Sequence, residues 1–479
     1  MSMAVRCFDQ ALPTVLGLLA EQFARFAEKA RPETTIVRDA FGGLFVVLPD
    51  DALPDTATWQ SLAARLHAAL GRYSPGERRV LLAVGDLIDA NDVLASADRV
   101  RLPDVPNTWL VDRLQTNQDW LRTPLGARPP LPTAVAFSIK GGVGRTTACA
   151  LWAWFLAREG RDVVVVDLDL ESPGLAGVLL SDERLPDYGL VDRLVESLRA
   201  PADELLLHEC LSDCPLAHDA PGRIRVLPAY GKKTRDYINK LGRIYMPSAS
   251  ADGAVLLGIA ERLWQLLEEL ARLPEPPDAV LLDSRAGLHD ISSAAMTRLA
   301  AQVFLFARDD PASWQAYGLL FDHLSKARSV QWGMPDDDLR WRLTMVVAQA
   351  DIAENTRQRA RKRCYETWQP LYDDEDDEDD EKGEQSVALG VGAGAATHTS
   401  ASADDCIAND DERAARVFAL DEDGPHQPLF IAFDPRLRAI DLADAAARPD
   451  WQTIAPTFAA FFAAATERLL RASEPDGAA

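Results

Sequence analysis

Residues 138–147 read S-I-K-G-G-V-G-R-T-T, and the rest of the chain is interpreted from this stretch. The apolar run 134–137 precedes it and predicts a short buried strand, while 146–159 follows it and predicts a helix. Glycines let the backbone turn tightly and approach an anion closely. The N–H groups and the dipole at the start of a helix favour negative charge there. A strand, a glycine-rich turn and a helix in this order therefore predict a phosphate-binding loop.

The loop carries two cations that depart from the common pattern G-x-x-x-x-G-K-[ST]. Arg145 stands in the place of the final lysine, and Lys140 adds a cation at the front of the loop. Arginine is longer than lysine, planar and always charged, and it prefers a two-point grip on phosphate oxygens. We therefore expect nucleotide binding to survive and hydrolysis to be slow. The loop residues expected around the phosphates are Gly141, Gly142, Val143, Gly144, Arg145, Thr146 and Thr147.

The early lysine in K-G-G-V-G-R-T resembles the variant phosphate loop of the ParA/MinD family, in a branch that carries arginine at the last cationic position. The resemblance covers residues 133–472 apart from an acidic insertion. It implies an ATP-dependent homodimer in which Lys140 reaches the nucleotide of the partner. The alternative, a glycine-rich turn without a ligand, is disfavoured because the strand, the loop, the helix and later motifs agree.

Carboxylates follow two further runs that predict buried strands. Four consecutive valines lead to Asp167, and Asp169 comes two residues later; a second apolar run ends at Asp283. Apolar runs of this kind are typical of parallel strands, and doubly wound sheets bind ligands at the carboxyl ends of such strands. Asp283 and the hydroxyl of Thr146 would hold Mg²⁺ beside the phosphates. By resemblance, Asp169 would position the attacking water and Asp167 would support the Mg²⁺ shell; solvated strand-end carboxylates are the alternative.

Three later segments fit the same kind of site. Residues 284–288, S-R-A-G-L, resemble the family's loop that senses the terminal phosphate, and Arg285 there either touches phosphate or is an ordinary surface arginine. The run 343–349 predicts a strand that ends in Gln349, where the family has the asparagine that reads adenine. Gln349 is expected to contact the base, with its identity left open. The late run 428–435 resembles the strand whose following loop borders the base.

Composition limits the class of protein. The chain has 479 residues, 47% of them hydrophobic, so it can form two to three domains with a large core. Its formal net charge of −24 disfavours attraction of the whole surface to DNA or to anionic membranes. Much of the excess lies in the acidic run 373–381, inside a segment, 372–414, that is expected to be a disordered insertion.

The sequence indicates a cytoplasmic protein. No run reaches the ~18 apolar residues that span a bilayer, and the first residues show no apolar segment typical of a signal peptide. The six cysteines are scattered, which argues against a disulfide framework. The final expected helix, 454–471, lacks the basic face of a membrane-binding helix, so we expect no membrane anchor.

The first part of the chain is expected to be a separate domain. The proline-rich stretch 128–132 marks its end, which divides the chain into a small α/β domain, 1–128, and a nucleotide-binding domain, 129–479. No catalytic set of side chains occurs in 1–128, so an interaction or dimerisation domain that binds a protein partner is favoured. Its expected elements are helices at 12–30 and 56–70 and strands at 34–38, 44–48 and 80–84.

Two further motifs are weighed against ordinary surface residues. His208, Cys210, Cys214 and His218 are zinc-ligand types, but their spacing matches no common zinc pattern, and ordinary side chains are favoured. The basic residues between 357 and 363 could bind DNA non-specifically in a protein of this family. The acidic run that follows them favours a solvated helix instead.

Alternation of strands and helices from 133 to 472 predicts an α/β fold with a doubly wound, mostly parallel sheet. The favoured function is an ATP-binding, slowly hydrolysing dimeric switch that regulates or positions a partner. The alternative is a hydrolysis-deficient, nucleotide-bound scaffold in a regulatory or phage-defence complex. A tyrosine kinase of the class that shares this loop is disfavoured, because no tyrosine follows Arg448.

Overall fold

A computed structural model describes residues 5–24, 26–27, 30–96, 98–102, 105–114, 116, 118–122, 128–199, 204–249, 256–299, 301–331, 339–372, 419–420, 424–437, 441–446 and 448–471. The acidic run 373–381, and with it all but the first residue of the insertion expected at 372–414, lies outside the described residues. Across the described part, no helix is both long enough and apolar enough to cross a membrane.

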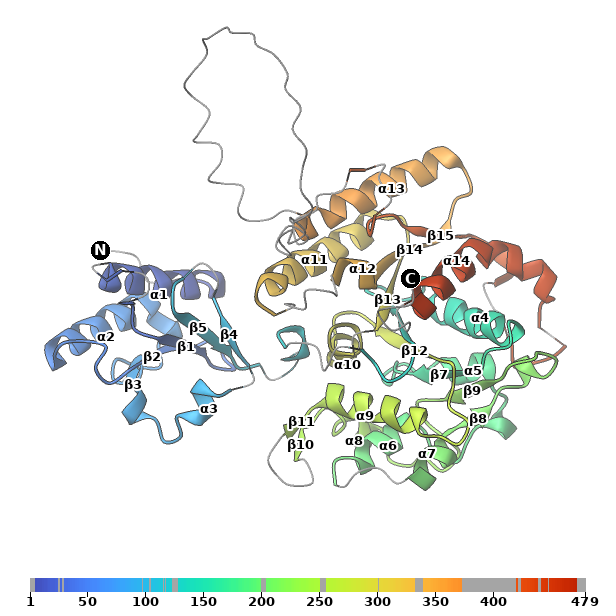
Figure 1. Ribbon diagram of the computed structural model, residues 1–479, viewed down its shortest axis with the longest axis horizontal. Helices are drawn as coiled ribbons and strands as arrows, with labels where there is room; N and C mark the ends of the chain where they lie inside the picture. Colours follow the sequence, from blue (N-terminus) through green and yellow to red (C-terminus); the bar gives the residue numbers. More distant parts are fainter. Residues whose placement is uncertain are drawn as a thin grey trace, which may run out of the picture.

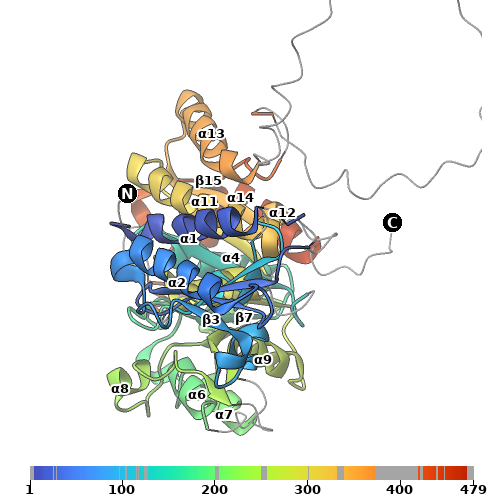
Figure 2. The same cartoon turned by 90° about the vertical axis from the view of Figure 1, so that its left-hand side faces the viewer.

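The described chain forms two main sheets that lie side by side along the long axis of the molecule (Figure 1). The smaller, five-stranded sheet has the order β3-β2-β1-β5-β4, and the larger, eight-stranded sheet has the order β15-β14-β13-β6-β12-β7-β9-β8. Figure 2 looks along the long axis, with the helices of the smaller unit in front. These sheets confirm the predicted α/β class, with a mostly parallel sheet and a smaller N-terminal α/β unit.

The smaller sheet is mixed. Strand β1 pairs antiparallel with β2 and parallel with β5, while β4 is antiparallel to β5. The strands predicted at 34–38 and 44–48 and the helix predicted at 56–70 are confirmed, whereas β4 and β5 were not predicted. The elements of this unit are α1 (Phe8–Phe23), β1 (Thr34–Arg38), β2 (Leu44–Leu48), α2 (Thr56–Leu70), β3 (Leu81–Ala83), α3 (Asn91–Leu94), β4 (Arg99–Arg101) and β5 (Thr108–Asp112).

Helix α1 covers different residues from the predicted helix at 12–30. Its buried positions, Ala11, Val15, Leu19 and Phe23, recur every four residues, and the helix ends where this apolar stripe ends. Packing against the sheet and α2 therefore decides the helix bounds, because most helical stability in proteins comes from burying one apolar face.

All neighbouring strands of the larger sheet are parallel except β8, which runs antiparallel to β9. Its strands are β6 (Thr133–Ser138), β7 (Val163–Asp167), β8 (Ser212–Asp213), β9 (Ile224–Leu227), β12 (Ala279–Ala286), β13 (Gln302–Ala307), β14 (Leu343–Ala350) and β15 (Leu429–Ala432), and β10 (Ser248–Ala249) with β11 (Leu256–Leu257) forms a separate pair. The α-helices are α4 (Arg145–Arg158), α5 (Leu175–Leu179), α6 (Leu190–Glu196), α7 (Glu204–Cys210), α8 (Tyr237–Leu241), α9 (Ile259–Ala271), α10 (Asp290–Ser293), α11 (Pro311–Gln331), α12 (Leu339–Arg342), α13 (Glu354–Trp368) and α14 (Trp451–Arg471).

Both faces of the larger sheet are buried under helices. Along β7, Val163 and Val165 belong to one core cluster with residues of α4, α5 and α14, while Val164 and Val166 belong to another with residues of α6, α9, α11 and α13. Successive side chains of a strand point to opposite faces, so a strand covered on both sides is apolar at every position. The run of four valines is thus explained by two helical layers.

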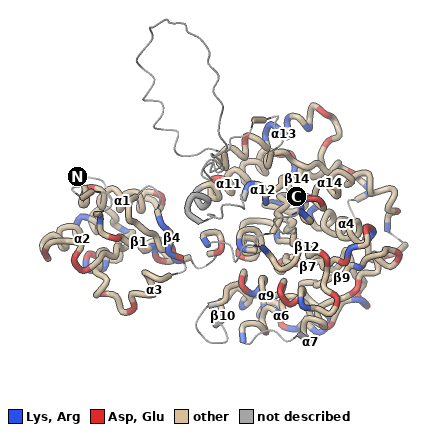
Figure 3. Tube along the Cα trace, in the orientation of Figure 1, with Lys and Arg blue, Asp and Glu red and all other residues tan. Residues whose placement is uncertain are grey.

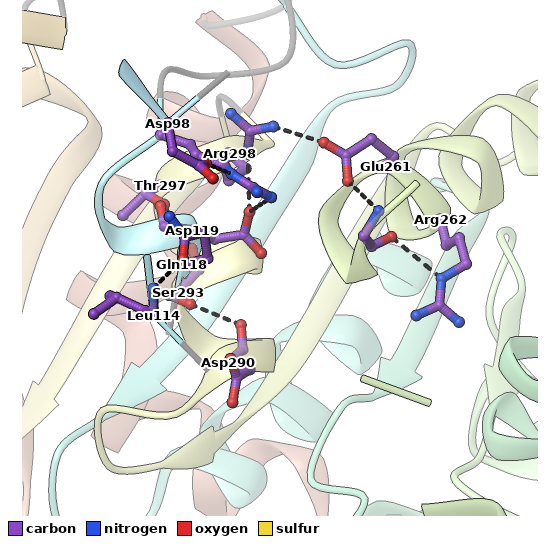
Figure 4. A network of polar contacts seen from close by, with 12 residues as sticks. Asp98, Leu114, Gln118, Asp119, Glu261, Arg262, Asp290, Ser293, Thr297 and Arg298 are labelled. Carbon is purple, nitrogen blue, oxygen red and sulfur yellow. Dashed lines mark hydrogen bonds and ion pairs between the residues drawn. The ribbon is translucent and has the colours of Figure 1, made fainter. Parts of the chain in front are cut away.

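A short segment joins the two units and packs on the larger one. Asp119, in the 3₁₀ turn η4 (Gln118–Trp120), lies 3.3 Å from Nε of Arg298 through Oδ1. Arg298 also pairs with Glu261 at 2.7 Å (Figure 4). Arg122 donates from Nε to Asp98 at 2.8 Å and lies 3.8 Å from Asp119. This network therefore connects Asp98, next to β4, with α9 and with the π-helical turn η7 (Ala294–Arg298) of the larger unit.

Backbones pack directly on each other at Gly189, which precedes α6. A Cβ atom at this position would lie 2.4 Å from the Cα of Tyr230. Gly189→Ala is expected to lower the free energy of unfolding by about 1–3 kcal/mol, because a rigid backbone must move. Gly177→Ala, in α5 with open space around it, is the matched control and should be neutral or slightly stabilising. Urea unfolding followed by tryptophan fluorescence measures both; equal losses would contradict the contact.

Asp119 makes stability depend on pH. Burial raises the pKa of Asp119 from 3.8 to about 6, since the opposing effects of Arg298 and Arg122 are smaller and Glu261 raises it further. The folded state therefore favours the protonated carboxyl, and this contribution, fully present below pH 3.8, is lost as the pH rises through about 6.

Between about pH 4 and pH 7 the wild type should lose roughly 2–3 kcal/mol more unfolding free energy than Asp119→Asn. Asp219→Asn, at a side chain that is 96% exposed, should follow the wild-type profile. Urea unfolding at several pH values provides the comparison. Parallel profiles for the wild type and Asp119→Asn would rule out a titrating Asp119.

Candidate functional site

The loop between β6 and α4 depends on glycine for its shape. The strand ends at Ser138, and the helix begins at Arg145 with Gly144 as its N-cap. Gly142 and Gly144 have φ angles of +72° and +88°, a region that residues with a Cβ rarely adopt. Nothing would crowd a side chain at Gly142, so its backbone conformation, rather than space, requires glycine there. The predicted strand–turn–helix order is present.

A cleft of about 1340 Å³ opens beside this loop, at the carboxyl ends of the parallel strands. Its lining includes residues 141–147 and polar groups from β14 and from the chain after β7. Ile352, Ala432, Phe433, Leu437 and Phe458 also line it and are apolar. A cavity lined both by the start of a helix and by apolar side chains suits a ligand with an anionic group and an aromatic base.

Arg145, the first residue of α4, contacts side chains from β6, from β12 and from the chain just after β7. Its Nε donates to Oδ1 of Asp283 at 2.8 Å, its Nη1 to Oγ of Ser138 at 3.1 Å, and its Nη2 to Oδ2 of Asp169 at 3.3 Å. The side chain is only 8% exposed. All three nitrogens of the guanidinium group are therefore committed to the protein.

Asp167 is fully buried and is held by the backbone. Its Oδ1 accepts from the N–H of Asp169 at 3.0 Å and its Oδ2 from the N–H of Leu175 at 3.2 Å. Burial, followed by the nearby Asp283, raises the pKa of Asp167 to about 8, although both backbone hydrogen bonds lower it. Of the described residues predicted to hold a metal, Thr146 lines the cleft, whereas Asp167 and Asp283 lie below its surface.

Lys140 is bound by an acidic residue of the same chain. Its Nζ donates to Oδ1 of Asp310 at 3.0 Å, and its side chain is 40% exposed. Asp310 also accepts from the N–H and the hydroxyl of Ser313. Burial alone would raise the pKa of Asp310, but the hydrogen bonds from Ser313 and Lys140 hold it below its usual value. In this state the side chain of Lys140 is directed to the start of α11.

Gln349 joins β14 to the phosphate-binding loop. Its Nε2 donates to the carbonyl oxygen of Gly142 at 2.9 Å, and its own φ angle is +53°. Positive φ is uncommon outside glycine, and asparagine adopts it more readily than glutamine. The pairing of β14 with β15 shifts register between Val347 and Ala350, which accommodates this residue. Gln349 lines the cleft, as does the following Asp351.

Two arginines add positive charge to the cleft. Arg308 is exposed directly after β13 and was not singled out in the sequence, although its place after an apolar run could have indicated it. Arg285, for which two interpretations were open, lines the cleft and also forms an ion pair with Glu171 at 3.0 Å. Both could meet an anionic ligand.

The four zinc-type residues do not assemble. Cys210 and Cys214 belong to core clusters on opposite faces of the sheet, and their thiols contact the carbonyl oxygens of Gly189 and Leu179. His208 and His218 are exposed. In the part of the chain that the structure describes, no three His, Cys, Asp or Glu side chains gather in a way that could hold a metal ion.

Acidic partners satisfy several basic residues of α13, which are blue in Figure 3. Arg361 pairs with Glu354 at 2.7 Å, and Arg363 pairs with Asp309 at 2.7 Å. Lys362 lies 3.8 Å from Glu366. Such pairing favours the solvated helix over a free basic surface for DNA.

Comparison with known proteins identifies the class of the larger unit. Residues 134–384, just over half of the chain, match the family described as the CobQ/CobB/MinD/ParA nucleotide binding domain. The chain therefore belongs to this family, in agreement with the resemblance to ParA/MinD proteins.

Individual relatives are more distant. The chain is 28% identical to the antiactivator FleN of Pseudomonas aeruginosa over 198 residues, which are 41% of this chain and 58% of that protein. It thus spans less than two thirds of FleN.

Three solved structures are similar at low TM-score. A ParA family ATPase from Chlorobium tepidum has 18% identity and a TM-score of 0.34, over 50% of this chain and 81% of that one. The ParA of pNOB8 has 15% identity and a TM-score of 0.36, over 72% and 99%. A cobyrinic acid a,c-diamide synthase from Mycobacterium smegmatis, bound to an ATP analogue and magnesium, has 20% identity and a TM-score of 0.33, over 49% and 80%.

The ion pair between Arg145 and Asp283 is expected to be essential for stability. Arg145→Met should lower the unfolding free energy by about 3–5 kcal/mol, because Asp283 would stay buried without its cation. The double variant Arg145→Met/Asp283→Asn should be clearly more stable than Arg145→Met alone. Urea unfolding of the wild type, of Arg145→Met, of Asp283→Asn and of the double variant, with the exposed Arg161→Met as control, measures this coupling. Losses that simply add would show that the two side chains do not interact.

Proposed function

We propose that this chain is an ATP-binding switch that forms a homodimer with ATP and hydrolyses it slowly, thereby regulating or positioning a partner. The cleft carries this proposal. It combines a loop whose backbone N–H groups can receive phosphates with apolar lining side chains, among them Phe433 and Leu437, that can receive a base. Membership of the CobQ/CobB/MinD/ParA family supports a nucleotide as its ligand.

Within this proposal Lys140 acts across the dimer. Its side chain is partly exposed at the front of the loop and pairs with Asp310 of its own chain. The phosphates of a nucleotide bound to a second subunit carry more negative charge than one carboxylate and would compete for this lysine. Dimerisation would then be coupled to the presence of ATP.

We further propose two domains with separate tasks. Residues 1–128 would bind the protein partner, and 129–479 would bind the nucleotide. The smaller sheet supports this division because it has apolar clusters of its own, one with residues of α1 and α2 and one with Val93 of α3. Because these apolar clusters belong to the smaller unit, the surface of that unit can change without disturbing the cleft of the larger one.

The environment of Asp169 favours slow turnover. We assign Asp169 to positioning the attacking water, yet its Oδ2 accepts a hydrogen bond from Arg145 at 3.3 Å. A carboxylate that is already paired is a weaker acceptor for a water proton. The same contact supports the second candidate function, a nucleotide-bound scaffold that does not hydrolyse ATP.

The test measures ATP turnover and particle mass on the same sample of the full chain. The wild type should dimerise with ATP and hydrolyse it slowly. Lys140→Ala should remain monomeric, whereas Asp169→Ala should accumulate as a dimer with turnover reduced about 100-fold or more. Lys362→Ala, at a lysine that is 67% exposed on α13, is the control and should match the wild type.

The other outcomes separate the candidates. Tight ATP binding with unchanged mass and no turnover would exclude the switch and support the scaffold. Absence of any nucleotide binding would exclude both.

A further inference from the structure

The family implies a Mg²⁺ ion beside the phosphates, and the two buried carboxylates expected to hold it, Asp283 and Asp167, do not fit that role. Mg²⁺ requires nearly octahedral oxygen ligands, usually one or two carboxylates together with water and phosphate oxygens. Asp283, which is 1% exposed, accepts a hydrogen bond from Arg145 with its Oδ1. Asp167, which is 0% exposed, accepts hydrogen bonds from backbone N–H groups with both of its oxygens. The two carboxylates expected to hold the ion are thus already hydrogen-bonded to groups of the protein.

Arg145 supplies the positive charge at this position. Its guanidinium group meets Asp283, Ser138 and Asp169, which come from three different segments of the sheet. The planar group has donors on three nitrogens and stays charged at any physiological pH, whereas lysine carries all its donors on a single nitrogen.

Removing this guanidinium group from its place would be unfavourable. The side chain is 8% exposed and its partner Asp283 is 1% exposed. Separating a buried ion pair leaves both charges without compensation, which is strongly destabilising. A divalent ion entering the site would have to displace a cation that is already well bound.

The cleft has other groups that can neutralise phosphates without a metal. Arg308 is exposed at its wall, and Arg285 lines it beside the loop. The start of α4 adds backbone N–H groups that point at an anion in this position. Arginine holds phosphate oxygens with paired, charge-assisted hydrogen bonds.

We propose that Arg145 takes the place of the divalent cation, so that the cleft binds nucleotide without Mg²⁺. This inference rests on the proposed nucleotide binding and names Arg145 as the residue that makes binding independent of metal. Arg145 thereby acts on the carboxylates of the site rather than on the phosphates.

The experiment measures the affinity of the full chain for a fluorescent ADP, mant-ADP, with EDTA and with millimolar Mg²⁺. For the wild type, the two dissociation constants should agree within about threefold. Arg145→Lys should bind at least about tenfold more tightly with Mg²⁺, because lysine can turn to the phosphates and free Asp283 for the ion. Arg161→Lys, an exposed arginine beyond the far end of α4, should behave as the wild type.

A second variant shows whether Asp283 is the group released. Arg145→Lys/Asp283→Asn should lose the Mg²⁺ effect of Arg145→Lys, and thermal melting confirms that both variants are folded. Wild-type binding that tightens tenfold or more with Mg²⁺ would overturn the inference and leave the proposed function intact. Arg145→Lys binding that stays independent of Mg²⁺ would also overturn it. If the wild type binds no mant-ADP in either condition, the proposed function fails as well.

Discussion

The buried contact between Arg145 and the carboxylate of Asp283 determines the electrostatics of the whole site. Parallel strands bring their carboxyl ends to one edge of a sheet, and here that edge gathers Asp167, Asp169 and Asp283. Like charges in a poorly hydrated place repel strongly. A single guanidinium group, 2.8 Å from Asp283 and 3.3 Å from Asp169, offsets this repulsion and fixes the strand ends to one another.

The phosphate-binding loop is held in the same way, by partners within the chain. Lys140 pairs with Asp310 beyond β13, and the amide of Gln349 donates to the carbonyl oxygen of Gly142 from β14. The first contact joins the loop to the chain after β13, and the second joins it to β14, which lies on the far side of β13 in the sheet. An anion that binds Lys140 must therefore compete with Asp310 for it, while the loop backbone is already shaped to receive a ligand in the cleft.

The connection between the two units lies close to the same machinery. Asp119 of the connecting segment contacts Arg298 in η7, and Asp290 of α10 contributes to its raised pKa. Helix α10 begins four residues after β12 ends, and β12 carries Asp283. A short and densely packed stretch of chain thus separates the cleft from the junction with the smaller unit.

The sequence alone determined those strands and helices whose signals lie in residues next to one another along the chain. Four valines in a row, the glycine-rich turn and the apolar runs around it are local signals, so β6, β7, α4 and the cleft at the strand ends could be predicted. The short strands β4 and β5 could not, because β5 forms by pairing with the distant β1, and β4 forms at the sheet edge by pairing with β5. Only the tertiary structure shows which side chains the two loop cations, Arg145 and Lys140, contact. Arg145 meets Asp283 across 138 residues and Lys140 meets Asp310 across 170, and only folding of the sheet brings such distant charges together.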